Sequence, residues 1–187
     1  MKIRGKDDIR LQALEILSFE GTEALSMSEL AKRVGLSKAT LYHYYESKEQ
    51  ILDDVFDSGH RHLMQHGFHL RLTGNAKDDL SALAENWLSL FRDDENYMYI
   101  RVLTSLHLTD DRAKDEYRAL ILMLRSQSEV VIQKAAEKGS ELLSSLFSSM
   151  LFSKLEEILE EDSDDDGILS EIEGFAELIR SGAISER

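Results

Sequence analysis

The chain of 187 residues contains no cysteine and no proline. Without cysteine, disulfide bonds, thiolate metal sites and cysteine nucleophiles are excluded. Without proline, and with abundant leucine, alanine, glutamate and serine, the composition favours helices throughout. Long apolar runs are also missing, because the longest, at 119–124, is far too short to cross a bilayer. The charged start of the chain lacks the apolar region of a signal peptide, so we expect a cytoplasmic protein without a membrane partner.

Organised catalytic motifs are missing as well. The sequence has no glycine-rich phosphate loop, no GxSxG elbow and no HExxH pair, and its many acids are not paired by pattern with a base. We therefore predict no catalytic residues, no cofactor and no enzyme activity. With 42% hydrophobic residues the chain has enough apolar side chains for a sizeable core, in one compact unit or in a small head on a larger body.

The most informative segment runs from Ser26 to Lys48. Ser26 and Glu29 form the pattern of a capping box, in which each side chain satisfies a free backbone donor at a helix start. Gly35 supplies the left-handed backbone that ends this helix. The residues that give the helix one apolar face are Leu30, Ala31 and Val34.

A second short helix is expected at 38–44, with Ser37 as its N-cap. Leu41 and Tyr45 lie four residues apart, so both can face inward and hold this helix on its neighbours. A helix, a glycine-containing turn and a second helix are the parts of a DNA-binding helix-turn-helix, here at about 27–46.

Five side chains are candidates for DNA contact. Lys38 and Thr40 lie at the N-terminal end of the second helix, the end that enters the major groove. The Thr40 hydroxyl can bond a base edge or a phosphate, and its methyl can touch a thymine. Tyr42 and His43 offer ring edges and donors one turn along, and Lys48 is placed for a backbone phosphate. An ordinary pair of surface helices with accidental caps is the alternative.

The segment GLSKATLYHYYESKEQIL, which begins at Gly35, resembles the DNA-binding domain of the tetracycline-repressor (TetR) family of bacterial regulators. The likeness covers roughly residues 4–60, and Tyr45 departs from the usual phenylalanine by adding a hydroxyl. It implies a two-fold dimer that binds a palindromic operator and is released by a small molecule. The matching positions are Gly35, Leu36, Ser37, Leu41, Tyr42, Tyr44, Tyr45, Lys48, Glu49, Ile51 and Leu52, with Ala13, Phe19, Gly21 and Ser26 upstream.

We therefore expect an all-α protein of about nine helices. A three-helix DNA-binding head would occupy residues 1–47, extending to about 60 with the start of a connecting helix. A larger helical body for ligand binding and dimerisation would occupy residues 48–187. The hydrophobic periodicity predicts body helices at about 78–92, 95–107, 111–138 and 141–160.

The net charge of −14 argues at first against a nucleic-acid partner. However, residues 1–50 hold eight of the 22 basic and eight of the 36 acidic residues, so the other 14 and 28 carry the whole excess. Salt screens this charge beyond about 8–10 Å, so we predict specific DNA binding with modest non-specific affinity. The basic groups near enough to meet phosphates are Lys2, Arg4, Lys6, Arg10, Lys32, Arg33, Lys38 and Lys48.

The helix expected at 141–160 combines a broad apolar stripe with interleaved serines at 144, 145, 148 and 149. Small residues beside large ones permit close helix approach, so this helix suits a subunit interface. The resemblance implies the same arrangement, in which the last two helices form a four-helix bundle with those of the partner. Internal core packing is the alternative.

An effector pocket is implied by the resemblance alone. The candidate lining residues in the body are Trp87, Tyr97, Arg101, His107 and Tyr117, with Phe91, Met98 and Tyr99 nearby. Aromatic residues on a helix stripe are more often core, which is the alternative for most of them. Because the body is acidic, a cationic or neutral apolar ligand is favoured over an anion.

Two patterns suggest metal sites instead. The segment Asp162–Glu173 matches the EF-hand calcium loop at Asp162, Asp164, Asp166, Gly167 and Glu173, although Glu161 occupies a normally apolar position and the chain has no second hand. The other pattern is His62, His66 and His69, which are spaced for one helix face and for zinc or copper binding. We predict no metal in either place, since acidic loops match by chance and Gly67 interrupts the histidine face.

The sequence thus predicts a dimeric, ligand-responsive transcriptional regulator that binds DNA, and more specifically a repressor. One alternative is a calcium-binding regulatory protein built on residues 162–173. Another is a helical interaction module whose helix-turn-helix does not bind DNA. The operator sequence, the regulated genes and the effector are not predicted.

Overall fold

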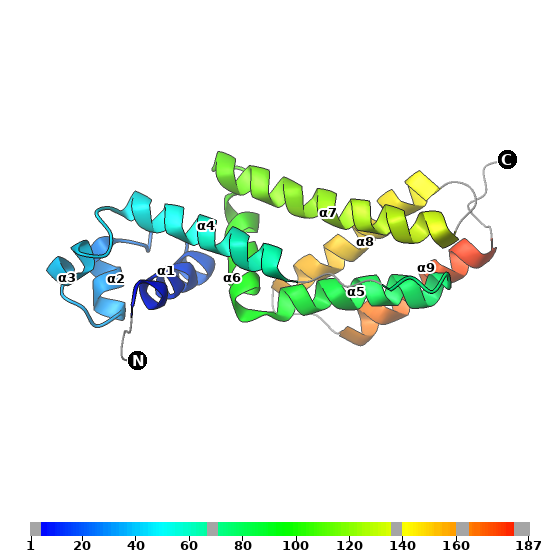
Figure 1. Ribbon diagram of the computed structural model, residues 1–187, viewed down its shortest axis with the longest axis horizontal. Helices are drawn as coiled ribbons and strands as arrows, with labels where there is room; N and C mark the ends of the chain where they lie inside the picture. The colour runs from blue at the N-terminus through cyan, green and yellow to red at the C-terminus, as the bar shows by residue number, and fades with distance from the viewer. Residues whose placement is uncertain (1–4, 67–70, 136–139, 160–164, 182–187) are drawn as a thin grey trace. The chain divides into compact units, whose positions relative to one another are not determined.

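The computed structural model describes residues 5–66, 71–135, 140–159 and 165–181, and the regular structure within these ranges is helical (Figure 1). The predicted all-α class is confirmed, and the body helices begin and end within about three residues of the expected positions. The helices of the described residues are α1 (Lys6–Glu20), α2 (Met27–Arg33), α3 (Lys38–Tyr42), α4 (Lys48–Gln65), α5 (Ala76–Arg92), α6 (Asp94–Leu106), α7 (Asp111–Ala135), α8 (Ser140–Leu159) and α9 (Asp165–Ser181).

These helices form two compact units. Unit 1 comprises residues 1–66 and 93–117, and unit 2 comprises residues 67–92 and 118–187. Helices α1 to α4, α6 and the first residues of α7 belong to unit 1, whereas α5, the rest of α7, α8 and α9 belong to unit 2. In the described part of the chain, no helix combines the length and the hydropathy needed to cross a membrane.

Helix α1 forms the centre of unit 1, where it packs against α2, α4 and α6. Its apolar stripe is buried, and Ile9, Ala13 and Ile16 have no exposed surface. Helix α4 also packs closely on α6, because Gly59 leaves room for the ring of Tyr99. A Cβ atom at Gly59 would lie 2.3 Å from that ring, so this glycine is required by packing.

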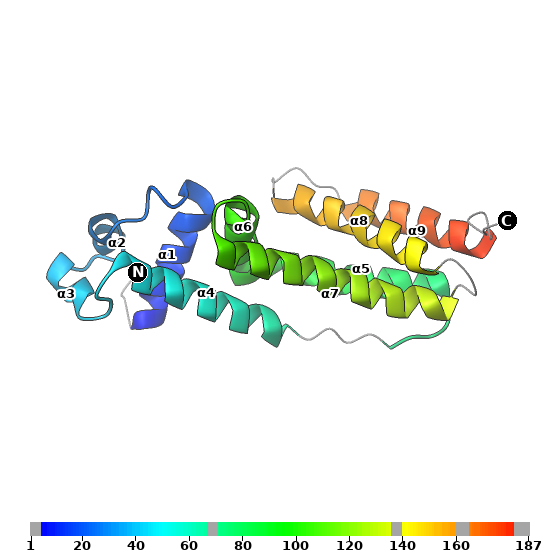
Figure 2. The same cartoon turned by 90° about the horizontal axis from the view of Figure 1, so that it is seen from above.

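In unit 2, helix α5 packs against α8 and α9, which run side by side (Figure 2). Trp87 and Phe91 of α5 are fully buried, and the Trp87 Nε1 donates a hydrogen bond to Gln127 Oε1 at 2.7 Å. The ring of Phe147 on α8 lies 5.2 Å from that of Phe175 on α9. An apolar core of this kind stabilises the unit through the surface it removes from water.

The loop before α5 is held by the buried carboxylate of Asp79. This group accepts hydrogen bonds from the Thr73 N–H at 2.7 Å, the Thr73 hydroxyl at 2.8 Å and the Gly74 N–H at 2.9 Å. Burial alone would raise the pKa of Asp79, but these hydrogen bonds outweigh it and hold the pKa below its usual range. Asp79 is therefore a charged anchor of unit 2.

Replacing Asp79 by Asn should destabilise the fold by about 1–3 kcal/mol at neutral pH, because the amide NH2 takes the place of one accepting oxygen and leaves at least one of the three donors without an acceptor. The folded pKa of Asp79 lies below the unfolded value of about 3.9. The stabilisation is thus fully present above that value and disappears as the pH falls towards the folded pKa. Urea unfolding of the wild-type and Asp79→Asn proteins should show a difference in the free energy of unfolding that disappears below about pH 4. A difference that is independent of pH would contradict this role.

Candidate DNA-binding surface

Helix α2 begins at the predicted Ser26 cap, and the turn after it contains the predicted left-handed glycine. The Glu29 N–H donates to Ser26 Oγ at 3.1 Å, which starts α2. At the other end Gly35 has a φ of 69°, and the Leu36 N–H donates to the Ala31 carbonyl at 2.9 Å. One expectation was wrong: the Glu29 carboxylate pairs with Arg33 Nε at 3.1 Å instead of closing the capping box.

Helix α3 is shorter than expected, since it ends at Tyr42 and the next residue is its C-cap. Ser37 is the N-cap, and its Oγ accepts from the Thr40 N–H at 3.0 Å. Leu41 and Tyr45 are fully buried, which confirms that they hold α3 on its neighbours. A further cap follows at Ser47, whose Oγ accepts from the Gln50 N–H and starts α4.

Four of the predicted DNA contacts lie together on α3 and its C-cap. Lys38 and His43 are exposed, Tyr42 is 45% exposed, and Thr40 is half-buried. The Thr40 hydroxyl lies 2.7 Å from Ser37 Oγ, so it takes part in the N-cap. Ala39, which sequence analysis did not single out, is exposed on the same short helix.

Lys48, the fifth candidate, has a partner within the protein. Its Nζ donates to the Thr22 carbonyl at 2.6 Å, which joins the start of α4 to the segment after α1. An ammonium group has three N–H donors, so two remain after this bond. A phosphate role for Lys48 therefore stays a prediction, and a structural role is added to it.

The other basic candidates differ in their availability. Lys32 is largely exposed, although its Nζ lies 3.7 Å from Glu29, whereas the less exposed Arg33 forms ion pairs with Glu20 and Glu29. Arg10 is only 7% exposed and pairs with Glu95, so the expected phosphate contact by Arg10 was wrong. Lys2 and Arg4 lie outside the described residues.

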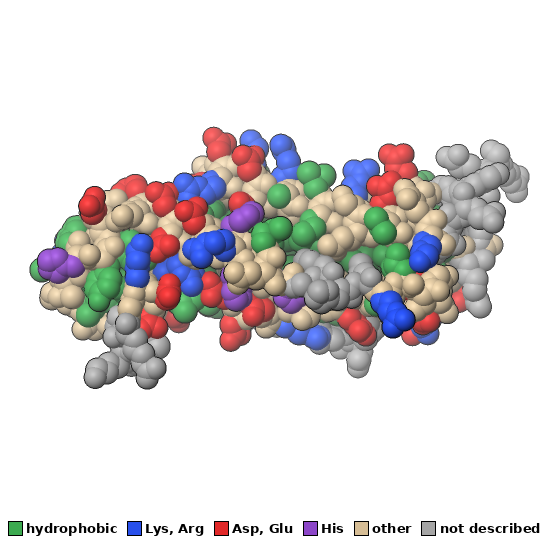
Figure 3. All heavy atoms as spheres, in the orientation of Figure 1, with side chains coloured by type: hydrophobic (Ala, Val, Ile, Leu, Met, Phe, Trp, Pro, Cys, Tyr) green, Lys and Arg blue, Asp and Glu red, His purple; other side chains and the backbone are tan. Residues whose placement is uncertain are grey.

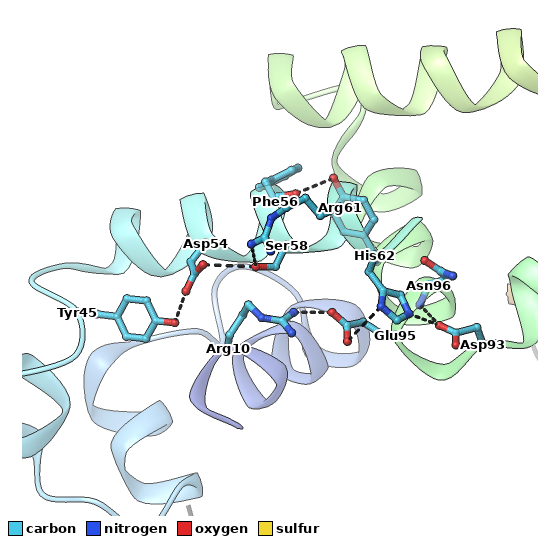
Figure 4. A network of polar contacts seen from close by, with 11 residues as sticks. Arg10, Tyr45, Asp54, Phe56, Ser58, Arg61, His62, Asp93, Glu95 and Asn96 are labelled. Carbon is cyan, nitrogen blue, oxygen red and sulfur yellow. Dashed lines mark hydrogen bonds and ion pairs between the residues drawn. The ribbon is translucent and has the colours of Figure 1, made fainter. Parts of the chain in front are cut away.

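The hydroxyl of Tyr45 joins the end of the helix-turn-helix to α4 (Figure 4). It donates to Asp54 Oδ2 at 2.6 Å, and Lys6 Nζ from α1 lies 3.2 Å from the same oxygen. Burial, reinforced by the Asp54 charge, raises the pKa of Tyr45 well above its usual range. Burial would also raise the pKa of Asp54, but the bonds from Tyr45 and Lys6 together lower it. Three elements of unit 1 thus meet at one carboxylate.

A second polar network in unit 1 links α1, α4 and the start of α6 (Figure 4). Arg10 donates to Glu95 at 2.6 Å, and His62 lies 2.8 Å from Asp93 and 3.9 Å from Glu95. Asp93 is also the N-cap of α6, where it accepts from the Asn96 N–H at 3.0 Å. Burial would raise the pKa of Asp93, but the Asn96 and His62 hydrogen bonds lower it overall. The network fixes the start of α6 against the other two helices.

The five candidate effector residues belong to different units. Trp87 lies in the core of unit 2, whereas Tyr97, Arg101, His107 and Tyr117 belong to unit 1. There, Arg101 donates to the Ser18 carbonyl and to the Tyr97 hydroxyl, both at 3.3 Å, while the His107 and Tyr117 rings stack 4.4 Å apart. Their role in ligand binding stays a prediction.

The segment that matches the EF-hand pattern does not have the form of a calcium-binding loop. Residues 162–164 lie outside the described residues, but α9 begins at Asp165 and so covers positions four to twelve of the pattern. An EF-hand requires a sharp turn at its sixth position, here Gly167, which is helical. For the histidine cluster, His62 pairs with Asp93 and His69 lies outside the described residues. In the described ranges, groups of three or more potential ligands suited to a metal ion do not occur.

Comparisons with known proteins agree with this geometry. Residues 9–55 match the model of the family described as "Bacterial regulatory proteins, tetR family". The chain is 26% identical over 128 residues to the uncharacterized HTH-type transcriptional regulator YdeS of Bacillus subtilis, a match covering 68% of this chain. It spans 62% of the length of YdeS, about three-fifths of that relative.

Solved structures share the fold over nearly the whole chain. A TetR-like transcriptional regulator from a Rhodococcus species superposes with a TM-score of 0.69 at 15% identity, covering all of both chains. A transcriptional regulator from Saccharomonospora viridis in complex with choline superposes with a TM-score of 0.65 at 14% identity, covering 92% of this chain and 95% of its own. The helix-turn-helix geometry and the match over 9–55 lead to one conclusion: residues 9–55 of this chain form a domain of the tetR family of bacterial regulatory proteins, and the chain as a whole shares the fold of a solved TetR-like regulator.

Proposed function

We propose that the protein is a transcriptional regulator that binds a specific DNA sequence through α3. The observation that carries this proposal is the capped, exposed helix itself. Ser37 caps it, Leu41 and Tyr45 are buried, and Lys38 and Tyr42 are exposed. In helix-turn-helix proteins the N-terminal part of such a helix contacts base edges in the major groove.

We further propose that two copies associate through α8 and α9, as the family resemblance implies. On α8, Leu142 and Leu146 lie one turn apart and are 53% and 47% exposed. On α9, Gly174 and Leu178 are exposed on one face, and a Cβ at Gly174 would meet no other atom. Apolar side chains of this size favour burial in a subunit interface. A two-fold dimer would place two α3 helices on the two half-sites of a palindrome.

A small-molecule effector would make the regulator responsive, and release from the operator would make it a repressor. The Saccharomonospora viridis regulator with this fold is in complex with choline. The excess acidity of residues 51–187 likewise favours a cationic or neutral apolar compound here. A tenfold change in operator occupancy requires about 1.4 kcal/mol of differential affinity between two states.

Selection of bound fragments from a random duplex pool tests the central proposal. The full-length protein should enrich a palindromic sequence, and fluorescence anisotropy should then measure its affinity at several salt concentrations. Enrichment of no sequence would contradict specific DNA binding and would favour the interaction module.

Replacing Lys38 by Ala should weaken binding to the selected site and reduce its salt dependence. Each lost phosphate contact lowers the slope of log K against log salt by about 0.9, hence by roughly two for a dimer. Lys48→Ala should do the same and also lose about 1 kcal/mol of stability, because the bond to Thr22 is removed. Lys114→Ala, an exposed lysine on α7, is the control and should change neither quantity. An unaltered slope for Lys38→Ala would remove Lys38 from the phosphate contacts.

Replacing Tyr45 by Phe should keep the buried ring but lose the bond to Asp54, at a cost of about 1–2 kcal/mol in the free energy of unfolding. DNA affinity should fall as well, because this bond joins the helix-turn-helix to α4. Tyr44→Phe is the matched control, since that side chain is 39% exposed and its loss of a hydroxyl should be neutral. Chemical denaturation compares the two variants, and equal stabilities would show that the Tyr45 hydroxyl contributes nothing.

Replacing Leu146 by Glu should dissociate the dimer, because two-fold symmetry would bury two unpaired carboxylates in one interface. Leu122→Glu on α7 is the control, since Leu122 has a similar exposure of 52% but lies outside α8 and α9. Sedimentation velocity at micromolar concentration should detect monomers only for the Leu146 variant. A wild-type protein that is monomeric under these conditions would refute the dimer.

A further inference from the structure

The exposed face of α3 and its C-cap is mainly apolar and aromatic. Ala39 and His43 are exposed, Tyr42 is 45% exposed, and Tyr44 just beyond is 39% exposed. Ala39, Tyr42 and His43 are spaced three and four residues apart, so they share one side of the helix. In Figure 3 the surface at the α3 end of unit 1 shows hydrophobic and histidine side chains gathered together.

Side chains that recognise bases through paired hydrogen bonds are scarce on this helix. Guanine is normally recognised by Arg or Lys, adenine by Asn or Gln, and cytosine by Asp or Glu. From 37 to 45 the sequence SKATLYHYY contains only Lys38 from this set. Several flanking residues of this kind have partners within the protein: Arg33 pairs with Glu20 and Glu29, Lys48 donates to the Thr22 carbonyl, and Gln50 Oε1 accepts from the Glu46 N–H.

Thr40 does not supply the missing hydrogen bond to a base, because its hydroxyl is hydrogen-bonded within the protein. The Thr40 Oγ1 lies 2.7 Å from Ser37 Oγ, and the Thr40 N–H also donates to that oxygen. The hydroxyl is thereby directed back to the N-cap of α3. Of the two roles predicted for this side chain, the structure favours contact through its methyl group.

We propose that α3 recognises thymine in the major groove through the C5-methyl group, with Ala39 as the main contact and Thr40 and Tyr42 beside it. This proposal rests on the DNA-binding function proposed above. The thymine methyl is the apolar group that base pairs present in the major groove. An exposed alanine methyl on the groove-facing side of a short helix can bury it without losing a hydrogen bond. Each half-site should therefore contain at least one thymine that is recognised in this way.

Deoxyuridine tests the proposal, because it differs from thymidine only by lacking this methyl. In the duplex selected by the wild-type protein, each thymine would be replaced singly by uracil and the affinity measured by anisotropy. Loss of one buried methyl should weaken binding about fourfold at the recognised position. The slope of affinity against salt should stay the same, since no phosphate contact changes.

The variant Ala39→Gly assigns the contact to a residue. Its affinity ratio between the thymine and the uracil duplex should fall from about four to about one. The ratio is measured within one protein, so a loss of helix stability in the variant cancels. Ala119→Gly, an exposed alanine on α7, is the matched control and should keep the wild-type ratio.

The outcomes separate this proposal from the function on which it rests. If uracil at every thymine leaves the affinity within twofold, or if the half-site contains no thymine, methyl recognition is wrong and DNA binding stands. If Ala39→Gly keeps the fourfold ratio, the contact belongs to another residue and the assignment to Ala39 is wrong. If no sequence is enriched from the random pool, the proposed function itself fails.

Discussion

The proposed DNA-binding surface depends on the stabilisation of a helix that is too short to be stable alone. Helix α3 has five residues, about 1.4 turns, and isolated helices in water need about 12–15 residues. Its conformation therefore comes from its surroundings. Ser37 satisfies a free donor at its start, and the burial of Leu41 and Tyr45 fixes its inner face. Any side chain on its outer face is positioned by these contacts, and the hydroxyl of Tyr45 adds a bond to Asp54 on α4.

Several charged residues of unit 1 meet at the N-terminus of α6. The N-terminus of α6 carries a partial positive charge, so Asp93 and Glu95 are favourable there. Arg10 from α1 and His62 from α4 lie beside these carboxylates, and Arg10 is buried in doing so. Breaking one partner of a buried ion pair leaves the other uncompensated, so such pairs resist change. The network gives α1, α4 and α6 a shared polar contact in addition to their apolar packing.

Local features of the fold could be predicted from the sequence, because capping depends on residues close in the chain. Ser26, Gly35 and Ser37 were assigned correctly for this reason. Contacts between distant residues could not be predicted. Nothing local distinguishes Arg10, which pairs with a residue 85 positions away, from an exposed arginine. The same holds for Gly59, because a glycine is required there only by the nearby ring of Tyr99 on another helix. Likewise, an acidic pattern at 162–173 says nothing of the helix that begins inside it.

The acidity of the protein and the apolar character of α3 are both compatible with DNA binding that depends little on electrostatic attraction. Affinity for any sequence grows with the number of phosphates neutralised, and here few basic groups are available for that. Arg10 and Arg33 are paired with acids, and Lys48 is bonded to a carbonyl, which leaves Lys32 and Lys38 as the more exposed lysines of the described head. For the proposed regulator, we therefore expect discrimination to come from contacts that depend weakly on charge. Burial of a base methyl is such a contact, because its free energy comes from apolar surface and is not screened by salt.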